Sequence, residues 1–239
     1  MNVVISQSMY FPWIGLLEQI KLADYFVHYD DVQFSKGSFV NRVQIKTPKG
    51  MQWLTVPLSD YHFGQKINEI QIKPTKDWRE LHLDLLRNSF IDSPFASDAI
   101  QIAEKVLSND YSNLAEISRA SLLALVDYFE LEIKTRFIDV SELDINGSST
   151  DRVLSIVKSL EGTRYITGHG ASRYLNHDSF ENEGIDIRYM DYSSIDYPQR
   201  FGEFTPYLSA LDLVAQCGHE GIKYICPKTI SWKEFTNAS

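Results

Sequence analysis

The opening of the chain arranges its elements in the order strand, loop, helix, strand. Val3–Ile5 is a short apolar run typical of a buried strand, and Tyr25–Tyr29 is a second run of aromatic and β-branched residues. Between them, apolar residues recur at helical spacing, at Trp13, Leu16, Leu17 and Ile20. Because this order usually forms a right-handed parallel βαβ unit, the opening predicts an α/β fold built on a parallel sheet.

The polar segments that follow these two strands mark the edge where a ligand is expected. Ligands of open parallel sheets bind beyond the carboxyl ends of the strands. Ser6–Tyr10 follows the first predicted strand and Asp30–Gln33 follows the second. The sequence therefore predicts that these two segments lie side by side at a site.

A β-hairpin is predicted next. Its strands are Phe39–Lys46 and Gln52–Pro57, and they flank the sequence Thr47-Pro48-Lys49-Gly50. Pro at the second position and Gly at the fourth suit a type I turn. We expect a third strand at Ile67–Ile72.

From Thr75 onward the pattern becomes mostly helical. We predict an α/β fold with a Rossmann-like βαβ opening, an inserted hairpin and a helix-rich second part. The expected units are residues 1–74, an α/β lobe with the basic hairpin, and residues 75–239, packed as one unit with the first. In the second unit we expect helices near residues 78–85, 99–106, 114–128, 153–160 and 209–216, and strands at 133–138, 165–167 and 185–189.

The composition excludes several classes of protein. Among 239 residues, 23 Lys and Arg against 32 Asp and Glu give a net charge of −9. Because nucleic acids and anionic lipids select basic surfaces, we predict neither as a partner. No apolar run approaches the ~18–20 residues of a membrane span. The chain has two cysteines, Cys217 and Cys226, which are too few for a disulfide scaffold, so we expect a cytoplasmic protein. The histidines lack the spacing of metal ligands, so we expect no metal site.

The strongest local anomaly is a change in charge. No acidic residue lies between Asp31 and Asp60, and this segment carries Lys36, Arg42, Lys46 and Lys49. Period-two alternation in the hairpin places Arg42 and Lys46 on one face and the aliphatic residues between them on the other. Arg and Lys side chains bind phosphate or carboxylate, so the hairpin predicts an anion site. A solvated outer face is the alternative interpretation.

Two further groups suit acid–base chemistry. Asp30 or Asp31, directly after the second strand, could accept a proton, although acids at a strand end often bond only local backbone amides. Gly168-His169-Gly170 follows a predicted strand, where glycines permit close approach of a ligand and His169 could exchange a proton. A tight turn that happens to contain His169 is the alternative.

Motifs that run through nearly the whole chain carry a resemblance. They include Gln7-Ser8-Met9-Tyr10-Phe11-Pro12-Trp13-Ile14-Gly15, Asp30-Asp31-Val32-Gln33-Phe34-Ser35-Lys36, Asn41-Arg42, Tyr165-Ile166-Thr167-Gly168, Tyr197-Pro198-Gln199, Gly202-Glu203-Phe204-Thr205-Pro206-Tyr207-Leu208-Ser209 and Leu211-Asp212-Leu213. In this order they resemble the WbqC-like family of bacterial polysaccharide (O-antigen) gene clusters. The family commonly begins with His-Gln-Pro, whereas this chain has Ser6-Gln7-Ser8. If that histidine is catalytic in relatives, another residue must replace it here.

The resemblance implies a role in surface-glycan assembly, and for some members the transfer of glycine or another acyl group to an amino sugar. We therefore predict an N-acyltransferase that acts on a nucleotide-linked amino sugar. It uses acyl-CoA or a similar donor as co-substrate and binds no permanent cofactor, and a homo-oligomer is compatible with this function. The predicted catalytic residues are Asp30, Asp31 and His169, and the predicted substrate-binding residues are Gln7, Tyr10, Lys36, Asn41, Arg42, Lys46, Gly168, Gly170 and Tyr174.

Two other functions remain open at this point. The opening also looks like that of a nucleotidylyltransferase, but Tyr10–Gly15 lacks the histidines that such enzymes carry at the start of the helix. A non-catalytic component of glycan assembly, which binds a sugar or a partner, is the third possibility. The missing histidine at position 6 favours this third function.

Overall fold

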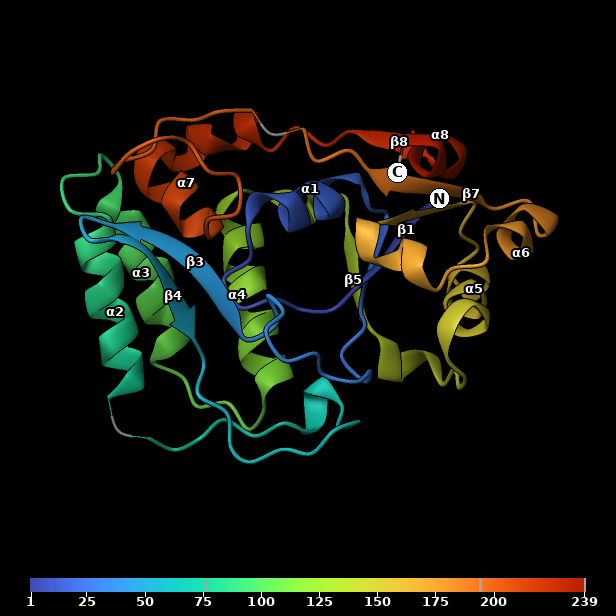
Figure 1. Ribbon diagram of the computed structural model, residues 1–239, viewed down its shortest axis with the longest axis horizontal. Helices are drawn as coiled ribbons and strands as arrows, with labels where there is room; N and C mark the ends of the chain where they lie inside the picture. Colours follow the sequence, from blue (N-terminus) through green and yellow to red (C-terminus); the bar gives the residue numbers. More distant parts are fainter. Residues whose placement is uncertain (76, 194, 239) are drawn as a thin grey trace.

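The computed structural model describes residues 1–75, 77–193 and 195–238. Its centre is a six-stranded sheet with the order β5–β2–β1–β6–β7–β8 (Figure 1). All neighbouring pairs are parallel except β7 and β8, which are antiparallel. The strands are β1 (Asn2–Ser6), β2 (Tyr25–His28), β5 (Arg136–Asp139), β6 (Arg164–Thr167), β7 (Asp186–Met190) and β8 (Thr229–Ser231).

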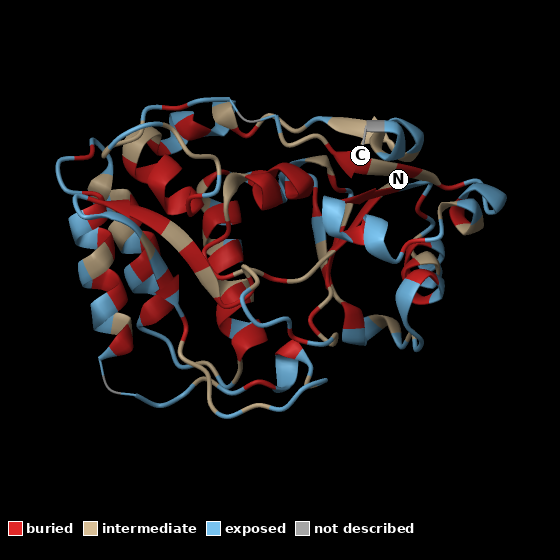
Figure 2. Ribbon diagram, viewed as in Figure 1, coloured by how far each residue is buried: buried red, intermediate tan, exposed pale blue. Residues whose placement is uncertain are grey.

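Helices cover both faces of this sheet. Successive side chains of a strand point to opposite faces, so Val4 packs in one buried cluster while Val3 and Ile5 pack in another. The cluster around Val4 includes residues of α1 (Ile14–Leu22) and α4 (Leu114–Tyr128). The opposite cluster includes residues of α5 (Ser149–Ser159), α6 (His177–Asn182) and α8 (Trp232–Ala238). Figure 2 shows that α1 is buried along most of its length.

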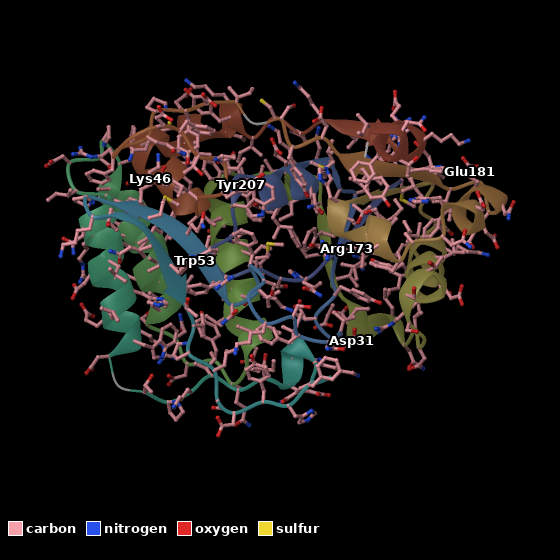
Figure 3. All side chains as sticks on the ribbon, viewed as in Figure 1. Asp31, Lys46, Trp53, Arg173, Glu181 and Tyr207 are labelled. Atoms are coloured by element: carbon pink, nitrogen blue, oxygen red, sulfur yellow. The ribbon has the colours of Figure 1, made fainter. Side chains whose placement is uncertain are left out.

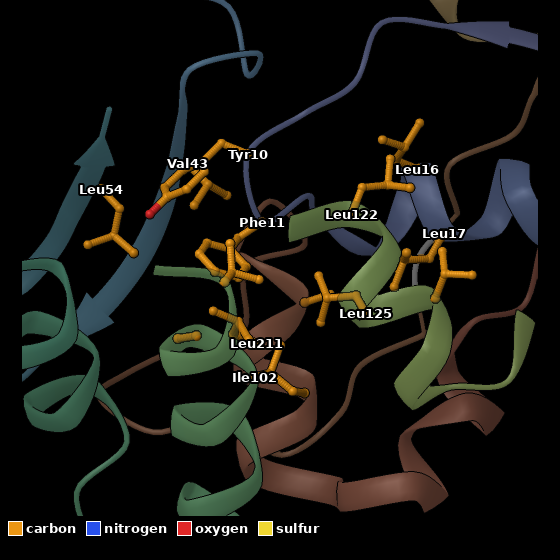
Figure 4. Close-up of a cluster of buried hydrophobic side chains, with 14 of the residues drawn as sticks. Tyr10, Phe11, Leu16, Leu17, Val43, Leu54, Ile102, Leu122, Leu125 and Leu211 are labelled. Carbon is orange, nitrogen blue, oxygen red and sulfur yellow. The ribbon is translucent and has the colours of Figure 1, made fainter. Parts of the chain in front are cut away.

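The predicted hairpin is confirmed as β3 (Arg42–Thr47) and β4 (Gly50–Thr55). Gly50 has φ +101°, a left-handed conformation that favours glycine at the turn. Val43 pairs with Leu54, and both are fully buried among α2 (Trp78–Ser89), α3 (Ala96–Leu107) and α7 (Ala210–Cys217) (Figure 4). The predicted alternation also holds, because Val43 and Ile45 are inaccessible while Arg42 and Gln44 are half-exposed.

The strand predicted at Ile67–Ile72 is wrong. Ile67–Glu69 is one turn of 3₁₀ helix, η1, and its amides bond the segment after β2, with Ile67 N–H to Val32 and Asn68 N–H to Asp30. Ile67 and Ile70 are fully buried at i, i+3 spacing, so the apolar pattern belongs to a helical turn. The sequence also did not predict β8 and α8. The strand predicted from Ile133 begins later, at Arg136, after the 3₁₀ turn η2 (Leu131–Ile133).

The structure is thus a mixed α/β fold with a mostly parallel central sheet and a helix-rich C-terminal part. The sheet takes β1 and β2 from before residue 75 and its other strands from after it. The division into residues 1–74 and 75–239 stays a prediction. Within the described residues, no helix is both long enough and apolar enough to cross a membrane.

Leu16 tests the contribution of the α1 face to stability. Its side chain is fully buried in the larger cluster (Figure 4), so Leu16→Ala should lower the free energy of unfolding by about 2–5 kcal/mol. Leu81→Ala is the matched control, because Leu81 is 57% exposed and should change stability by only about 0.5 kcal/mol. Urea denaturation measures both; equal losses would contradict this packing.

Candidate functional site

A buried polar network lies at the carboxyl ends of β1, β2 and β5. Asp30, which is 0% exposed, accepts hydrogen bonds from Ser8 N–H (2.8 Å), Ser8 Oγ (2.8 Å) and Arg119 Nε (2.6 Å). A second nitrogen of Arg119 donates to Asp139 at the end of β5. His28 Nδ1 lies 2.9 Å from Ser8 Oγ, and burial lowers the pKa of His28 to about 4. The network joins the loops after β1 and β2 to the strands β2 and β5 and to α4.

This network corrects the catalytic assignment of Asp30. Both of its carboxylate oxygens are occupied, and none of its surface reaches solvent. A general base must reach the proton that it removes, so Asp30 is a structural anchor. Ser8, His28, Arg119 and Asp139 were missed, because their proximity depends on strand order and not on any sequence spacing.

Asp31 is held by a different cation. Arg152 of α5 binds it with two nitrogens, at 2.9 and 2.6 Å, and the same guanidinium lies 5.1 Å from the ring of Tyr29. Bidentate arginine–carboxylate pairs are among the stronger charge-assisted hydrogen bonds. The base role predicted for Asp31 is therefore not supported in this arrangement.

His169 lies where the order of the strands reverses. β1 pairs with β2 on one side and with β6 on the other, and His169 begins the 3₁₀ helix η4 (His169–Arg173) two residues after β6 ends. Its Nε2 is 2.7 Å from the carbonyl oxygen of Met190 at the end of β7. Since a carbonyl only accepts, Nε2 carries the proton, and Nδ1 of the neutral ring keeps its lone pair. Among the three predicted catalytic side chains, His169 alone is exposed.

A row of aromatic rings extends from His169. Ring centroids are 5.1 Å apart for His169 and Tyr192, 4.8 Å for Tyr192 and Trp13, and 5.4 Å for Trp13 and Tyr207. We call these four residues the ring row. Gly168 is required beside it, because a Cβ there would lie 2.9 Å from Tyr192 Oη, which accepts a hydrogen bond from Gln19. The sequence indicated Trp13 only as part of an apolar helical pattern, and it did not indicate a role for Tyr192 or Tyr207.

Lys46 does not form the predicted anion site. Lys46 is only 6% exposed, and its Nζ donates hydrogen bonds to Gln199 Oε1 at 2.9 Å and to the carbonyl of Glu203. Burial lowers the pKa of Lys46. Lys46 therefore braces the loop that carries Tyr207, and Figure 3 labels both residues.

Arg42 is half-buried, and its guanidinium lies 4.2 Å from the Trp53 ring while Nη2 donates to the Gly37 carbonyl at 2.6 Å. Its Nε and the Ser38 hydroxyl are buried without a hydrogen-bond partner within the described chain. Lys36 is exposed nearby in sequence. Of the four basic residues of this segment, Lys36, Arg42 and the exposed Lys49 thus remain compatible with an anion, and Lys46 does not.

The other predicted binding residues divide between core and surface. Tyr10 is fully buried, and its hydroxyl lies 2.9 Å from His82 Nδ1, so its assignment as a binding residue is corrected to packing. Asn41 is 7% exposed and donates to the Val56 carbonyl, which is also a structural contact. Gln7 is half-buried just after β1, Gly168 is half-buried after β6, and Gly170 and Tyr174 are exposed.

Comparison with known proteins supports the family. The profile of the WbqC-like protein family matches residues 7–224, which include every residue of the ring row. The chain belongs to the WbqC-like family. It is also 34% identical to an uncharacterized protein of Mycobacterium tuberculosis, Rv1507c, over 227 residues that cover 94% of this chain and 97% of that protein. No solved structure gives a significant match.

The structure explains three motif residues of this WbqC-like chain. Tyr197 Oη donates to Asp212 at 2.9 Å, and Asp212 is 2% exposed. Gln199 accepts from Thr205 N–H at 3.0 Å and donates to the Thr205 carbonyl at 2.9 Å. These contacts and Lys46 fix both ends of the segment before Tyr207.

Arg119 tests the anchoring network. Arg119→Met leaves the buried Asp30 carboxylate without its cation, which should cost about 3–5 kcal/mol of stability. Arg136→Met, an exposed arginine on the edge strand β5, is the control and should change stability by only about 0.5 kcal/mol. Chemical denaturation compares the two, and an unchanged Arg119→Met midpoint would refute the anchor.

Asp212 gives a prediction with a defined direction in pH. Burial raises its pKa from 3.8 to about 6, so the folded state holds the proton more tightly than the unfolded state does. Its stabilising contribution is therefore complete below pH ~4 and is lost as the pH rises through 6. Asp212→Asn should flatten this decline and be more stable than the wild type at pH 8, by on the order of 1–3 kcal/mol. Thermal denaturation from pH 4 to 8 measures the difference; parallel curves would contradict it.

Proposed function

We propose that this WbqC-like protein is an N-acyltransferase that uses a thioester donor such as acyl-CoA and acts on the amine of a nucleotide-linked amino sugar. The setting that we propose is surface-polysaccharide assembly in the cytoplasm. Family membership supports the biological setting, and the site at the carboxyl edge supports the chemistry. The neighbours of β1 also support the proposal, because β2 and β6 pair with β1 on opposite sides, and open parallel sheets bind ligands where the strand order reverses.

The observation that carries the chemical proposal is the hydrogen bond from His169 Nε2 to the Met190 carbonyl. It leaves Nδ1 as a proton acceptor on an exposed side chain at the expected position. In a catalytic histidine, one ring nitrogen usually makes a hydrogen bond that fixes the tautomer, and the other ring nitrogen is left for the reaction.

In the proposed reaction, the amine nitrogen of the sugar attacks the carbonyl carbon of the thioester. A C–N bond forms and the C–S bond breaks. His169 Nδ1 takes the proton from the nitrogen and passes it to the departing thiolate, which leaves as a thiol. We propose the carboxamide of Gln7, which follows β1, and the first backbone amides of η4 as donors to the developing oxyanion.

Nucleotidyl transfer is disfavoured by the start of α1. The Trp13 indole lies against Gly15, so closely that a Cβ there would be 2.2 Å from the ring. This indole covers the first turn of the helix, and no histidine lies in Tyr10–Gly15. The non-catalytic role stays the second candidate, because Ser6 stands where the family commonly has histidine.

Mass spectrometry tests the transfer. The protein is incubated with acetyl-CoA and UDP-, dTDP- and GDP-linked amino sugars, and each product gains the mass of one acyl group while free thiol appears. His169→Gln should lower the rate by about 10²–10⁴-fold, since its amide can still donate to Met190 but cannot take the proton. His62→Gln, on an exposed loop, should keep the rate. Binding without turnover would instead support the non-catalytic role, and a fully active His169→Gln would exclude His169 as the base.

A further inference from the structure

Tyr207 presents an unusual exposed ring. It is 49% exposed, and Trp13 packs against it at a centroid distance of 5.4 Å. Trp13 is itself half-buried and continues through Tyr192 to His169. The ring row therefore has an open end at Tyr207 and a proton acceptor at the other end.

The loop that carries Tyr207 is held rigidly on both sides. Before it, Lys46 and Thr205 bond Gln199. After it, Leu208 forms a β-bridge with Gln44 of the hairpin, and Ser209 N–H donates to the Gln44 carbonyl at 2.9 Å. A ring that is already positioned loses little conformational entropy when a ligand stacks on it.

Two other exposed aromatic side chains, Trp53 and Phe63, are poorer candidates for stacking. Trp53 is 39% exposed, but the Arg42 guanidinium lies 4.2 Å from its ring centroid and Phe39 lies 5.9 Å away. Phe63 is 93% exposed on the loop between β4 and η1. Among the described residues, no ring packs behind Phe63 as Trp13 packs behind Tyr207.

A free cation lies on the same short helix as His169. Arg173 is exposed, and it forms no ion pair or side-chain hydrogen bond within the part of the chain that the structure describes. Figure 3 labels both Arg173 and Tyr207. In a chain of net charge −9, an unpaired guanidinium beside a candidate site suits a phosphate group.

We propose that the exposed face of Tyr207, backed by Trp13, is the stacking subsite for the nucleobase of a sugar nucleotide, with Arg173 as the cation for its diphosphate. The inference rests on the proposed function, because it takes the reacting sugar to lie at His169. Tyr192 and Trp13 separate His169 from Tyr207, so the two ends of the row suit the two ends of one ligand. In a sugar nucleotide, the diphosphate joins the sugar to the nucleoside. If the sugar lies at His169, the base therefore lies at Tyr207.

Calorimetric titration of the full chain tests this subsite with UDP, dTDP, GDP and glucosamine 1-phosphate as probes. Tyr207→Ala should weaken the best-binding nucleoside diphosphate by about tenfold or more, because stacking on an aromatic side chain contributes that much per base. It should leave glucosamine 1-phosphate unaffected. Tyr207→Phe keeps the ring and should bind within twofold of the wild type, as should the control Phe63→Ala, which removes an exposed ring elsewhere. Arg173→Gln should weaken all four probes.

The results separate this inference from the proposed function. Unchanged nucleoside diphosphate affinity in Tyr207→Ala would overturn the subsite, and so would a wild-type protein that binds none of the three diphosphates. A loss confined to glucosamine 1-phosphate would also overturn it, since the ring would then hold the sugar. If Tyr207→Ala loses the nucleoside diphosphate as predicted but the wild type transfers no acyl group, the subsite stands and the transferase proposal falls.

Discussion

The buried carboxylate of Asp30 is the contact on which the carboxyl edge of the sheet depends. It receives hydrogen bonds from Ser8 after β1 and from Arg119 on α4, and Arg119 extends the network to Asp139 at the end of β5. Burying an ion pair costs desolvation free energy, which its Coulomb attraction and extra hydrogen bonds must offset. Removing one partner would therefore leave the other uncompensated. The network fixes the loops that lead into α1 and into the hairpin, and Trp13 follows the first of these loops.

Buried charge also organises the opposite side of the site. Lys46 is held by Gln199 and Glu203, and Asp212 is held by Tyr197. These contacts join the hairpin to the segment before α7, so the position of Tyr207 depends on residues far away in sequence. Lys46 of the basic hairpin contributes to the site by supporting this loop, whereas Lys36, Arg42 and Lys49 remain compatible with a ligand.

The sequence predicted the local elements well and the environments of individual side chains poorly. Periodicity located β1, α1, β2 and the hairpin within a few residues, because those patterns reflect burial on one face. The errors at Ile67–Ile72, Tyr10 and Lys46 share one cause. The environment of each of these residues is set by a segment that is distant in sequence and packs over it. His169 was identified because glycines flank it directly after a strand, whereas Tyr192 and Tyr207 carried no comparable local signal.

The C-terminal segment adds a contact that the family match does not include. The match ends at residue 224. Beyond it, the ring centroid of Phe235 in α8 lies 4.8 Å from that of His169 and 4.2 Å from that of Tyr189. His169 is thus held between Tyr192 and Phe235 while Met190 fixes its tautomer.

The tautomer of His169 is the most direct test of this account. Long-range ¹H–¹⁵N NMR spectra of protein labelled with ¹⁵N-histidine distinguish protonated from unprotonated ring nitrogens, and His169→Gln assigns the signal. We predict a proton on Nε2 and a lone pair on Nδ1 of the neutral ring, because Nε2 faces the Met190 carbonyl. A proton on Nδ1 would contradict it, because the nitrogen proposed to accept the proton would already carry one.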